Sequence, residues 1–480
     1  MKVYWIIVIS FLIYYSKSSD SDIVFVYEHV RHGARSPLFL NGNTKYLDAF
    51  GTQWEGASTL TNVGKREHYV LGIHNRLKYS SLINFTKYDY QEIKVYSTNS
   101  GRTIQSIQAE LHAMYLPGTI PKLTKEQLSA AYPPFQNLSS EVLDEVAKLN
   151  DSTIINDINV FPIQMSDPKK VQLNDPSNCP FMKQYQAELE NKTRSGIIKD
   201  FVKNCAAKYG EKLKEVLNRT DEDVNSFDYI QIILAEEVIC NYYDGNKLED
   251  FFKKTGFNSS EFIQDNRESK IIYIYNLNMD EQSGVMAASP SMKDIINYMD
   301  NIINNKSQMP KMVMQGGHDD TISYFQYFMK HVFNIPIQYI PFASNIYFEL
   351  HKNKSESESD KYYLEYILDG VTKLKMNYPE FKIKVLEAVW SDEDINKFCY
   401  PPEKEDITDE KTDENKTEYE KYKTYTIALL STTIFLFIST VVFLALFIVH
   451  YKQYKTFSGN SITNDSILNG KKNNEMQLIE

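Results

Sequence analysis

The stretch Arg31-His32-Gly33-Ala34-Arg35-Ser36-Pro37 follows an unbroken apolar run, Ile23-Val24-Phe25-Val26-Tyr27. A short run without polar alternation predicts a strand that is buried on both faces of a mostly parallel sheet. The strand is expected to end near His29, so the seven residues follow its carboxyl end, where ligands bind in open α/β sheets. Two arginines flank a histidine there, and Gly33 lets the backbone turn tightly. The pattern indicates a site for an oxyanion, with one imidazole nitrogen left free to attack it.

Two later segments also place polar residues between an expected strand and an expected helix. Ile93–Tyr96 predicts a short strand, and Arg102 follows it at the first turn of a helix, where exposed backbone N–H groups favour an anion. Met312–Met314 predicts another strand, followed by a tight turn that carries His318 and Asp319 and then by a helix. We therefore expect a single site that is assembled from three distant segments of the chain.

The remaining periodicity predicts an α/β fold with a central mixed, mostly parallel sheet and flanking helices. Gly64–Tyr79 and Ser291–Ile303 are expected to be helices, and Ile346–Leu350 and Tyr362–Leu368 are expected to form a terminal strand pair. The first of these helices has an apolar side, which is formed by Val70, Leu71, Ile73 and Leu77.

Prolines break the chain into short pieces after about residue 116, and a mainly helical stretch follows them. We therefore expect a catalytic core made of residues 19–115 and 285–400. A mainly helical cap over residues 116–284 would interrupt this core. Residues 401–420 carry nine acidic and three basic side chains, so residues 401–424 are expected to form a solvated stalk.

The composition excludes one class of partner. The chain has 480 residues, enough for a large two-part core, and its formal net charge is −11. No cluster of lysine and arginine interrupts this negative balance. Because phosphate backbones are held by basic surface, a nucleic-acid partner is not expected.

The two ends of the chain predict a membrane-anchored protein. A basic start, the apolar run Val3–Tyr15 and the small residues after it are typical of a signal peptide over residues 1–18. Thr426–Val449 contains 24 residues without a charge. At about 1.5 Å per residue this segment extends about 36 Å, which is enough to cross a bilayer. We expect a type I protein with a transmembrane helix at 425–449 and a cytoplasmic tail at 450–480.

Two further features agree with a lumenal or extracellular body. Its four cysteines are an even number and predict two disulfides; a zinc site is the alternative, but no Cys-X-X-Cys pair supports it. The lysines just before the expected span favour the reverse orientation, yet a long translocated domain is largely insensitive to flanking charge. Sequons for N-glycosylation occur at Asn84, Asn137, Asn150, Asn191, Asn218, Asn258, Asn305, Asn353 and Asn415.

The motif Arg31-His32-Gly33-X-Arg35-X-Pro37 resembles the signature RHGxRxP of the histidine acid phosphatases, a branch of the histidine phosphatase superfamily. His318-Asp319 resembles the later histidine-aspartate pair of that family, and Arg102 resembles its third phosphate-binding arginine. Leu60–Gly64 and Pro341–Ser344 also resemble family stretches. The resemblance is strongest near the two ends of the body and faint in its helical middle.

The resemblance implies an acid phosphatase that hydrolyses phosphate monoesters. His32 would attack phosphorus and form a phosphohistidine, and Asp319 would protonate the leaving oxygen and later help water attack. Four side chains would hold the phosphoryl oxygens: Arg31, Arg35, Arg102 and His318. No metal or other cofactor is expected, because the arginines neutralise the charge that would repel the nucleophile.

The resemblance also implies a disulfide between Cys179 and Cys399. Asn178-Cys179-Pro180 is similar to the surroundings of a family cysteine that is bridged to one near the C-terminal end of the domain. This leaves Cys205 and Cys240 as the second expected pair. Asn345 stands where animal members of the family have a cysteine.

Alternatives remain for substrate, role and location. A phytase-like or lysophospholipid phosphatase would use the same site, since specificity lies in the divergent cap. A catalytically inactive receptor ectodomain is a further alternative, against which stands the presence of all six expected site residues. Tyr454-Lys455-Thr456-Phe457 resembles a tyrosine-based sorting signal, so a lysosomal, endosomal or cell-surface location is expected. A homodimer is left open.

Overall fold

The computed structural model describes residues 21–401 except for these internal stretches: 39–45, 49, 134–137, 218–219, 221, 223–224, 226–235, 247, 273–278, 355–356 and 358–360. The expected signal peptide, nearly all of the expected stalk, the expected transmembrane helix and the expected tail lie outside the described residues. Within the described residues, no helix is both long enough and apolar enough to span a bilayer.

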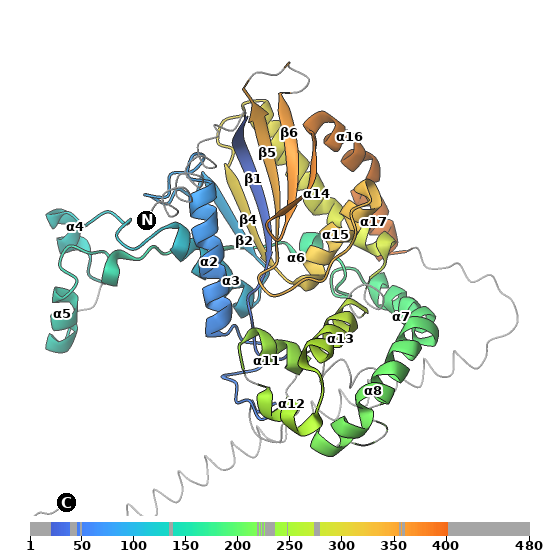
Figure 1. The fold of residues 1–480 in the computed structure, drawn as a ribbon. Coiled ribbons are helices and arrows are strands. Elements are labelled where there is room, and N and C mark those ends of the chain that lie inside the picture. The colour runs from blue at the N-terminus through green and yellow to red at the C-terminus, as the bar shows by residue number, and fades with distance from the viewer. Residues whose placement is uncertain are drawn as a thin grey trace, which may run out of the picture. The chain divides into compact units, whose positions relative to one another are not determined.

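A seven-stranded mixed sheet lies at the centre of the fold, in the order β3-β2-β4-β1-β5-β6-β7 (Figure 1). Strands β3, β2, β4 and β1 run parallel, whereas β1, β5, β6 and β7 pair antiparallel. The mixed α/β sheet is confirmed, and its parallel character is confined to one half. The strands are Ser21–Arg31 (β1), Ile93–Ser97 (β2), Gln164–Met165 (β3), Met312–Gly317 (β4), Asn345–Asn353 (β5), Tyr362–Leu368 (β6) and Val371–Asn377 (β7).

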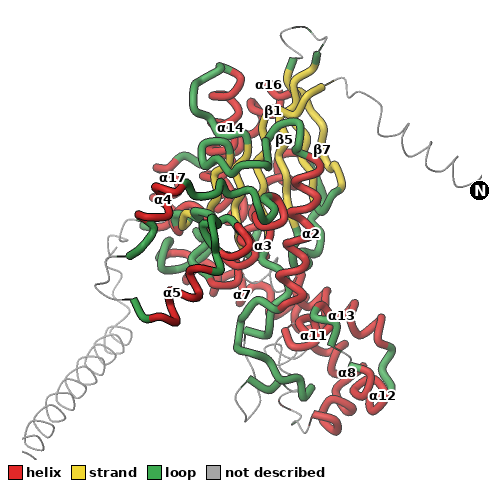
Figure 2. Tube along the Cα trace, turned by 90° about the vertical axis from the view of Figure 1, so that its left-hand side faces the viewer, coloured by secondary structure: helices red, strands yellow, loops and turns green. Residues whose placement is uncertain are grey.

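Helices cover both faces of the sheet (Figures 1 and 2). One face packs against α2 (Asn62–Lys78) and α3 (Gly101–Met114), and the other packs against α14 (Glu281–Ile303), α15 (Asp319–Phe333) and α16 (Tyr378–Ala388). This double covering explains why β1 carries apolar residues without polar alternation.

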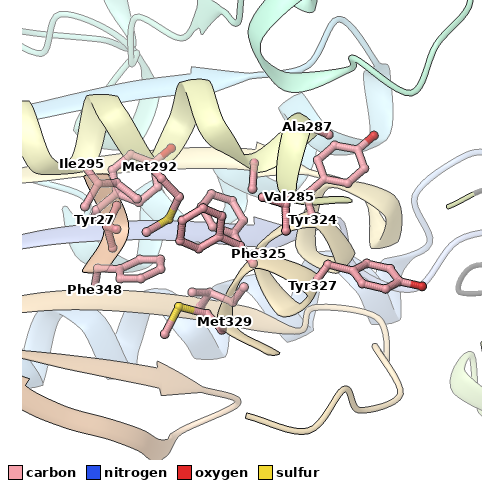
Figure 3. Close-up of a cluster of buried hydrophobic side chains, with 14 of the residues drawn as sticks. Tyr27, Val285, Ala287, Met292, Ile295, Tyr324, Phe325, Tyr327, Met329 and Phe348 are labelled. Atoms are coloured by element: carbon pink, nitrogen blue, oxygen red, sulfur yellow. The ribbon is translucent and has the colours of Figure 1, made fainter. Parts of the chain in front are cut away.

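Alternate residues of β1 belong to two different hydrophobic clusters. Phe25 and Tyr27 pack with α14 and α15, where Figure 3 shows Tyr27 among side chains that include Met292 and Phe348. Val26 and Val30 point the other way and pack with α3. The expectation of a strand buried on both faces is therefore confirmed. The strand runs to Arg31, slightly beyond its expected end.

Helix α2 buries a different side from the apolar one that its sequence shows. Its buried residues are Gly64, His68, Gly72 and Asn75, whereas Leu77 is 68% exposed. Close packing explains this, because a Cβ on Gly72 would meet the backbone of Glu110 in α3. His68 and Asn75 both hydrogen-bond to Glu110, so this interface is built from small and hydrogen-bonded polar residues.

Helices also dominate the described part of residues 116–284, the stretch for which the name cap is kept. Helices α8, α12 and α13 share a hydrophobic cluster that contains Tyr209, Phe251 and Phe262. The helices that the structure describes between α3 and α14 are α4 (Lys125–Ala130), α5 (Ser140–Ala147), the 3-10 turn Ile155–Asp157, α6 (Pro168–Val171), α7 (Phe181–Thr193), the π-helical turn Arg194–Ile198, α8 (Lys199–Leu217), α11 (Ile239–Tyr243), α12 (Glu249–Thr255) and α13 (Ser259–Ile272).

The cysteines form one of the two expected disulfides. Cys179, just before α7, is bonded to Cys399 at the end of α17 (Asp392–Cys399), so the cap is joined to the C-terminal end of the core. The expected bridge between Cys205 and Cys240 is wrong, because neither residue is in a disulfide. Cys205 is buried in the cluster of α8, α12 and α13, whereas Cys240 is buried in another cluster beside Phe342. Separate packing keeps the two thiols from pairing.

Candidate active site

The register of the parallel strands brings the three expected segments together. Arg31 at the end of β1 lies opposite Gly317 at the end of β4, and Ser97 at the end of β2 lies opposite Gly316. The backbone continues this pairing beyond the strands, since His32 N–H donates to the Gly317 carbonyl over 3.0 Å. His32, Arg102 and His318 therefore all follow strand ends at one edge of the sheet.

The loop after β1 is fixed by close packing and by hydrogen bonds. A Cβ on Gly33 would collide with the backbone of Gly64, so only glycine fits where this loop meets the start of α2. The Gly33 N–H donates to Ser106 Oγ (3.1 Å), and the Ala34 N–H donates to Glu67 Oε2 (2.7 Å). The helices α2 and α3 thus set the position of the histidine.

His32 is held as a neutral imidazole. Its Nδ1 lies 2.9 Å from the Gly33 carbonyl oxygen, which can only accept, so Nδ1 carries the proton. Burial, and next the charges of Arg31 and Arg102, hold the pKa of His32 well below its usual range. The Nε2 lone pair is therefore available for nucleophilic attack.

Three arginines lie close to this histidine, and each is anchored by a different group. Arg31 donates to the Ile340 carbonyl (2.7 Å), contacts Asp319 Oδ2 (2.9 Å) and lies 4.3 Å from the ring centre of Phe342. Arg102 donates to Ser58 Oγ over 2.7 Å. Burial, and then the neighbouring charge of Arg35, lower the pKa of Arg102 to about 10.

Arg35 is paired with a carboxylate from the cap. Its Nη1 and Nη2 lie 2.9 Å and 3.3 Å from the two oxygens of Glu236, and both side chains are buried. Glu236 lies three residues before Ile239, the first residue of α11, so the cap contacts the loop that follows β1 through this pair.

Each of the three arginines has one N–H donor without a hydrogen-bond partner in the described chain. The Nε atoms of Arg31, Arg35 and Arg102 are all buried, and none has a hydrogen-bond partner within the described chain. An unpaired buried donor costs free energy, so three of them near one histidine indicate a place built for an anion with several oxygens.

Sequence comparison agrees with this geometry. Residues 23–369 match the family described as "Histidine phosphatase superfamily (branch 2)". The chain belongs to this branch.

Relatives of this phosphatase include acid phosphatases. This chain is 22% identical to the prostatic acid phosphatase of Bos taurus over 346 residues, which cover 71% of this chain and 77% of the relative. It is 23% identical to the lysosomal acid phosphatase of Xenopus laevis over 340 residues, or 70% and 68% of the two chains. Among solved structures it resembles the phytase from Citrobacter braakii, with a TM-score of 0.48 and 14% identity over 72% of this chain and 84% of the phytase.

In this phosphatase the turn after β4 supplies a second histidine and two carboxylates. His318 Nδ1 lies 3.3 Å from an Arg102 nitrogen, which can only donate, and Nε2 lies 3.0 Å from Thr98 Oγ1. Burial and then Arg102 lower the pKa of His318 to about 3, so this ring is also neutral. Its two nitrogens are both engaged by protein groups in this arrangement.

The carboxylate after Asp319 is also part of the site. Asp320 accepts from Asn174 of the cap over 3.3 Å. Burial and then Asp319 raise the pKa of Asp320 to about 6. The sequence alone does not place Asp320 in the site, because neither the effect of the neighbouring carboxylate on its pKa nor its contact with Asn174 is visible in a linear pattern.

All six residues expected at the site lie together in the structure, which adds others that the sequence did not single out: Ser58, Thr98, Asn174 and Glu236. None of these four carries a recognisable motif. Glu236 in particular is separated from Arg35 by 201 positions. Phe342 lies in a stretch that resembles the family, and the stacking on Arg31 gives this residue a physical role.

One cluster in the described chain has the spacing of metal ligands, and it lies elsewhere. It consists of Glu349 and His351 on β5 and Glu365 on β6. Lys78 Nζ already contacts Glu349 Oε1 over 2.5 Å and supplies a positive charge there. We therefore assign this cluster to structural pairing between the strands and α2.

Proposed function

We propose that the protein is an acid phosphatase that hydrolyses phosphate monoesters through a phosphohistidine on His32. The observation that carries this proposal is the neutral, buried His32 close to three arginines whose Nε donors lack partners. Similarity to the prostatic and lysosomal acid phosphatases supports the same substrate class.

The first chemical step transfers the phosphoryl group to the enzyme. Arg31, Arg35 and Arg102 hold the phosphoryl oxygens and neutralise their charge. The His32 Nε2 lone pair forms a bond to phosphorus while the bond from phosphorus to the ester oxygen breaks. The carboxyl of Asp319 donates its proton to that oxygen, so the alcohol leaves in its neutral form.

The second step regenerates the enzyme. Asp319 accepts a proton from water as the water oxygen bonds to phosphorus, and the bond between nitrogen and phosphorus breaks. Inorganic phosphate leaves, and His32 returns to its neutral form. His318 is a fourth donor to the phosphoryl oxygens when its Nε2–H turns from Thr98 Oγ1 to the substrate.

The contact between Arg31 and Asp319 links binding to proton transfer. Asp319 Oδ2 lies 2.9 Å from Arg31 Nη2. Among the ion pairs described, Asp319 is the closest anionic partner of Arg31. A substrate phosphate competes with Asp319 for that guanidinium. Binding therefore frees Asp319 from the ion pair, and the freed carboxylate takes up a proton from solvent before it protonates the leaving oxygen.

Trapping the intermediate tests the mechanism. Rapid quenching with a radiolabelled aryl phosphate is expected to give protein-bound phosphate that survives alkali and is lost in acid, as a phosphohistidine would be. His32→Ala should abolish both labelling and turnover, whereas His331→Ala, at an exposed histidine on α15, should change neither. Full turnover in His32→Ala would rule out this mechanism.

We further propose that the catalytic body works in the lumen or outside the cell, attached by a span at 425–449. The buried disulfide Cys179–Cys399 supports an oxidising compartment. Similarity to a lysosomal acid phosphatase supports a lumenal location. Endoglycosidase should then increase the protein's gel mobility, and alkaline carbonate should leave the protein in the membrane pellet. A glycan-free protein in the cytosolic fraction would contradict this location.

A further inference from the structure

A cavity lies at the edge of the sheet opposite to the proposed catalytic residues. It has a volume of about 1030 Å³ and lies between the end of α2, the loop 80–87 and the chain that follows α3. Lys311, which lines it, directly precedes β4, whereas the catalytic His318 directly follows β4. The length of the strand thus separates this cavity from the proposed active site.

The walls of this cavity are largely apolar. Ile83 and Met114 are buried in the hydrophobic cluster beneath α3, and Leu116 remains 41% exposed. The apolar residues that line the cavity are Leu82, Ile83, Phe85, Met114, Leu116, Ile120 and Pro121. Such walls suit a hydrocarbon body.

The charges that line the cavity are all positive. Arg76, Lys87 and Lys311 line it, and no aspartate or glutamate does. This is unusual in a chain whose net charge is −11. Lys311 is paired with Glu92 over 2.5 Å, but Arg76 forms no ion pair within the described residues.

Arg76 also has an unsatisfied donor. Its Nη1 is buried and has no hydrogen-bond partner in the part of the chain that the structure describes. A buried guanidinium nitrogen without an acceptor is costly, and a carboxylate or phosphate oxygen would satisfy it. The cavity therefore combines an apolar wall with a cation that lacks an anion.

We propose that this cavity binds an amphipathic anion, such as an alkyl carboxylate or alkyl phosphate, with its charged head on Arg76. The alkyl chain lies against Phe85, Met114 and Ile120. The charged head satisfies the Arg76 donor, and the apolar body displaces water from the walls. This site is independent of the phosphatase reaction.

Photolabelling of the full-length protein in nanodiscs of zwitterionic lipid tests this site. The probe is a decanoic acid that carries a diazirine, used after enzymatic removal of N-glycans because Asn84 lines the cavity and lies in a sequon. We expect saturable labelling of peptides that contain residues 80–87 or 114–121. The diazirine analogue of decanol should label them at least about tenfold less, because it lacks the charge.

Variants on α2 make the test specific. Arg76→Gln should reduce labelling about tenfold, and Arg76→Lys should retain most of it. Arg66→Gln removes the same charge from an exposed position of the same helix and should have no effect. Turnover of para-nitrophenyl phosphate reports that each variant is folded.

Each of the following outcomes would overturn the proposal. These are labelling that does not saturate or maps elsewhere, equal labelling by the acid and the alcohol, and undiminished labelling in folded Arg76→Gln. Displacement of the probe by inorganic phosphate, with loss of labelling at 80–87 and 114–121, would show that a free anion is the occupant and would also refute the amphipathic ligand.

Discussion

Glu236 of the cap and Arg35 of the catalytic loop form a buried ion pair with two hydrogen bonds, of 2.9 Å and 3.3 Å. Burial alone would lower the pKa of Arg35, but Glu236 holds it above its ordinary value. The pair occupies both Nη atoms and leaves Nε without a partner. The cap therefore balances a charge of the catalytic loop and fixes the arginine that is proposed to hold phosphate.

Removing this carboxylate should destabilise the free enzyme and increase its response to phosphate. In Glu236→Gln the buried guanidinium loses its counter-ion, which costs roughly 3 kcal/mol of folding stability. Inorganic phosphate can replace the missing negative charge, so it should raise the Tm of this variant more than that of the wild type. Thermal unfolding with and without phosphate measures both effects.

A matched control uses an exposed ion pair. Glu215 pairs with Lys212 on the surface of α8, and Glu215→Gln should leave both Tm values close to those of the wild type. Equal Tm values for Glu236→Gln and the wild type would show that the buried pair has no energetic role.

The close approach of Gly33 to Gly64 predicts a large loss of activity in Gly33→Ala. The new Cβ would collide with the backbone of Gly64 and displace His32. A shift of about 1 Å in a nucleophile can cost about a hundredfold in kcat. Gly101→Ala is the control, because a Cβ there has no neighbour within 4 Å. Comparable kcat values for the two variants would contradict the steric argument.

The buried carboxyl of Glu110 predicts that stability falls with rising pH. Burial raises the pKa of Glu110 to about 8, so the folded protein holds a proton that the unfolded chain releases above about 4.5. The folded state binds more protons across this window, and its stability falls by about 1.4 kcal/mol per pH unit from this group. The contribution of Glu110 to stability is fully present below about pH 4.5 and is lost as the pH rises to about 8.

The pH dependence of stability that comes from histidine must be separated from the one that comes from Glu110. The pKa of His68 is lowered to about 4 by burial, so its contribution to stability rises between about 4 and 6.5 and is then constant. Unfolding should therefore be measured between pH 6.5 and 8, where Glu110→Gln should be less sensitive to pH than the wild type. Glu145→Gln, at an exposed position of α5, should behave as the wild type does. A wild-type slope in Glu110→Gln would contradict the assignment.

The cysteine arrangement predicts two thiols outside any disulfide in the unreduced protein. Four cysteines less the bonded pair Cys179–Cys399 leave Cys205 and Cys240. Thiol titration after unfolding without reductant should therefore detect two reactive thiols per chain. A value near zero would show that Cys205 and Cys240 form a second disulfide. Cys399→Ser should lower the free energy of unfolding by about 2–5 kcal/mol, whereas Cys205→Ser should not change the number of disulfides.

Local patterns predicted the elements that carry the chemistry. The apolar run of β1 required a strand covered on both faces, and the motif after it required a cationic turn around His32. Arg102 and His318 could be placed for the same reason, because a strand followed by a helix puts the intervening residues at the edge of the sheet. These signals depend on residues that are close together in the sequence, so they can be recognised without the tertiary structure.

Contacts between distant segments could not be predicted in this way. Glu236 lies in the cap, and nothing around it in the sequence marks it as the partner of Arg35. The hydrophobic pattern of α2 suggested an apolar contact, yet close packing on α3 selected the glycine, histidine and asparagine side instead. The even number of cysteines suggested a second bridge that separate packing prevents.

The sequence by itself thus predicted His32 as the candidate nucleophile, its cationic neighbours, and the alternation of strands and helices. Each of these follows from residue type and short-range spacing. The tertiary structure alone decided which carboxylate balances Arg35, which tautomer His32 adopts, and which cysteines pair. These depend on burial and on distances of a few ångströms between residues far apart in the chain, and a linear pattern contains neither.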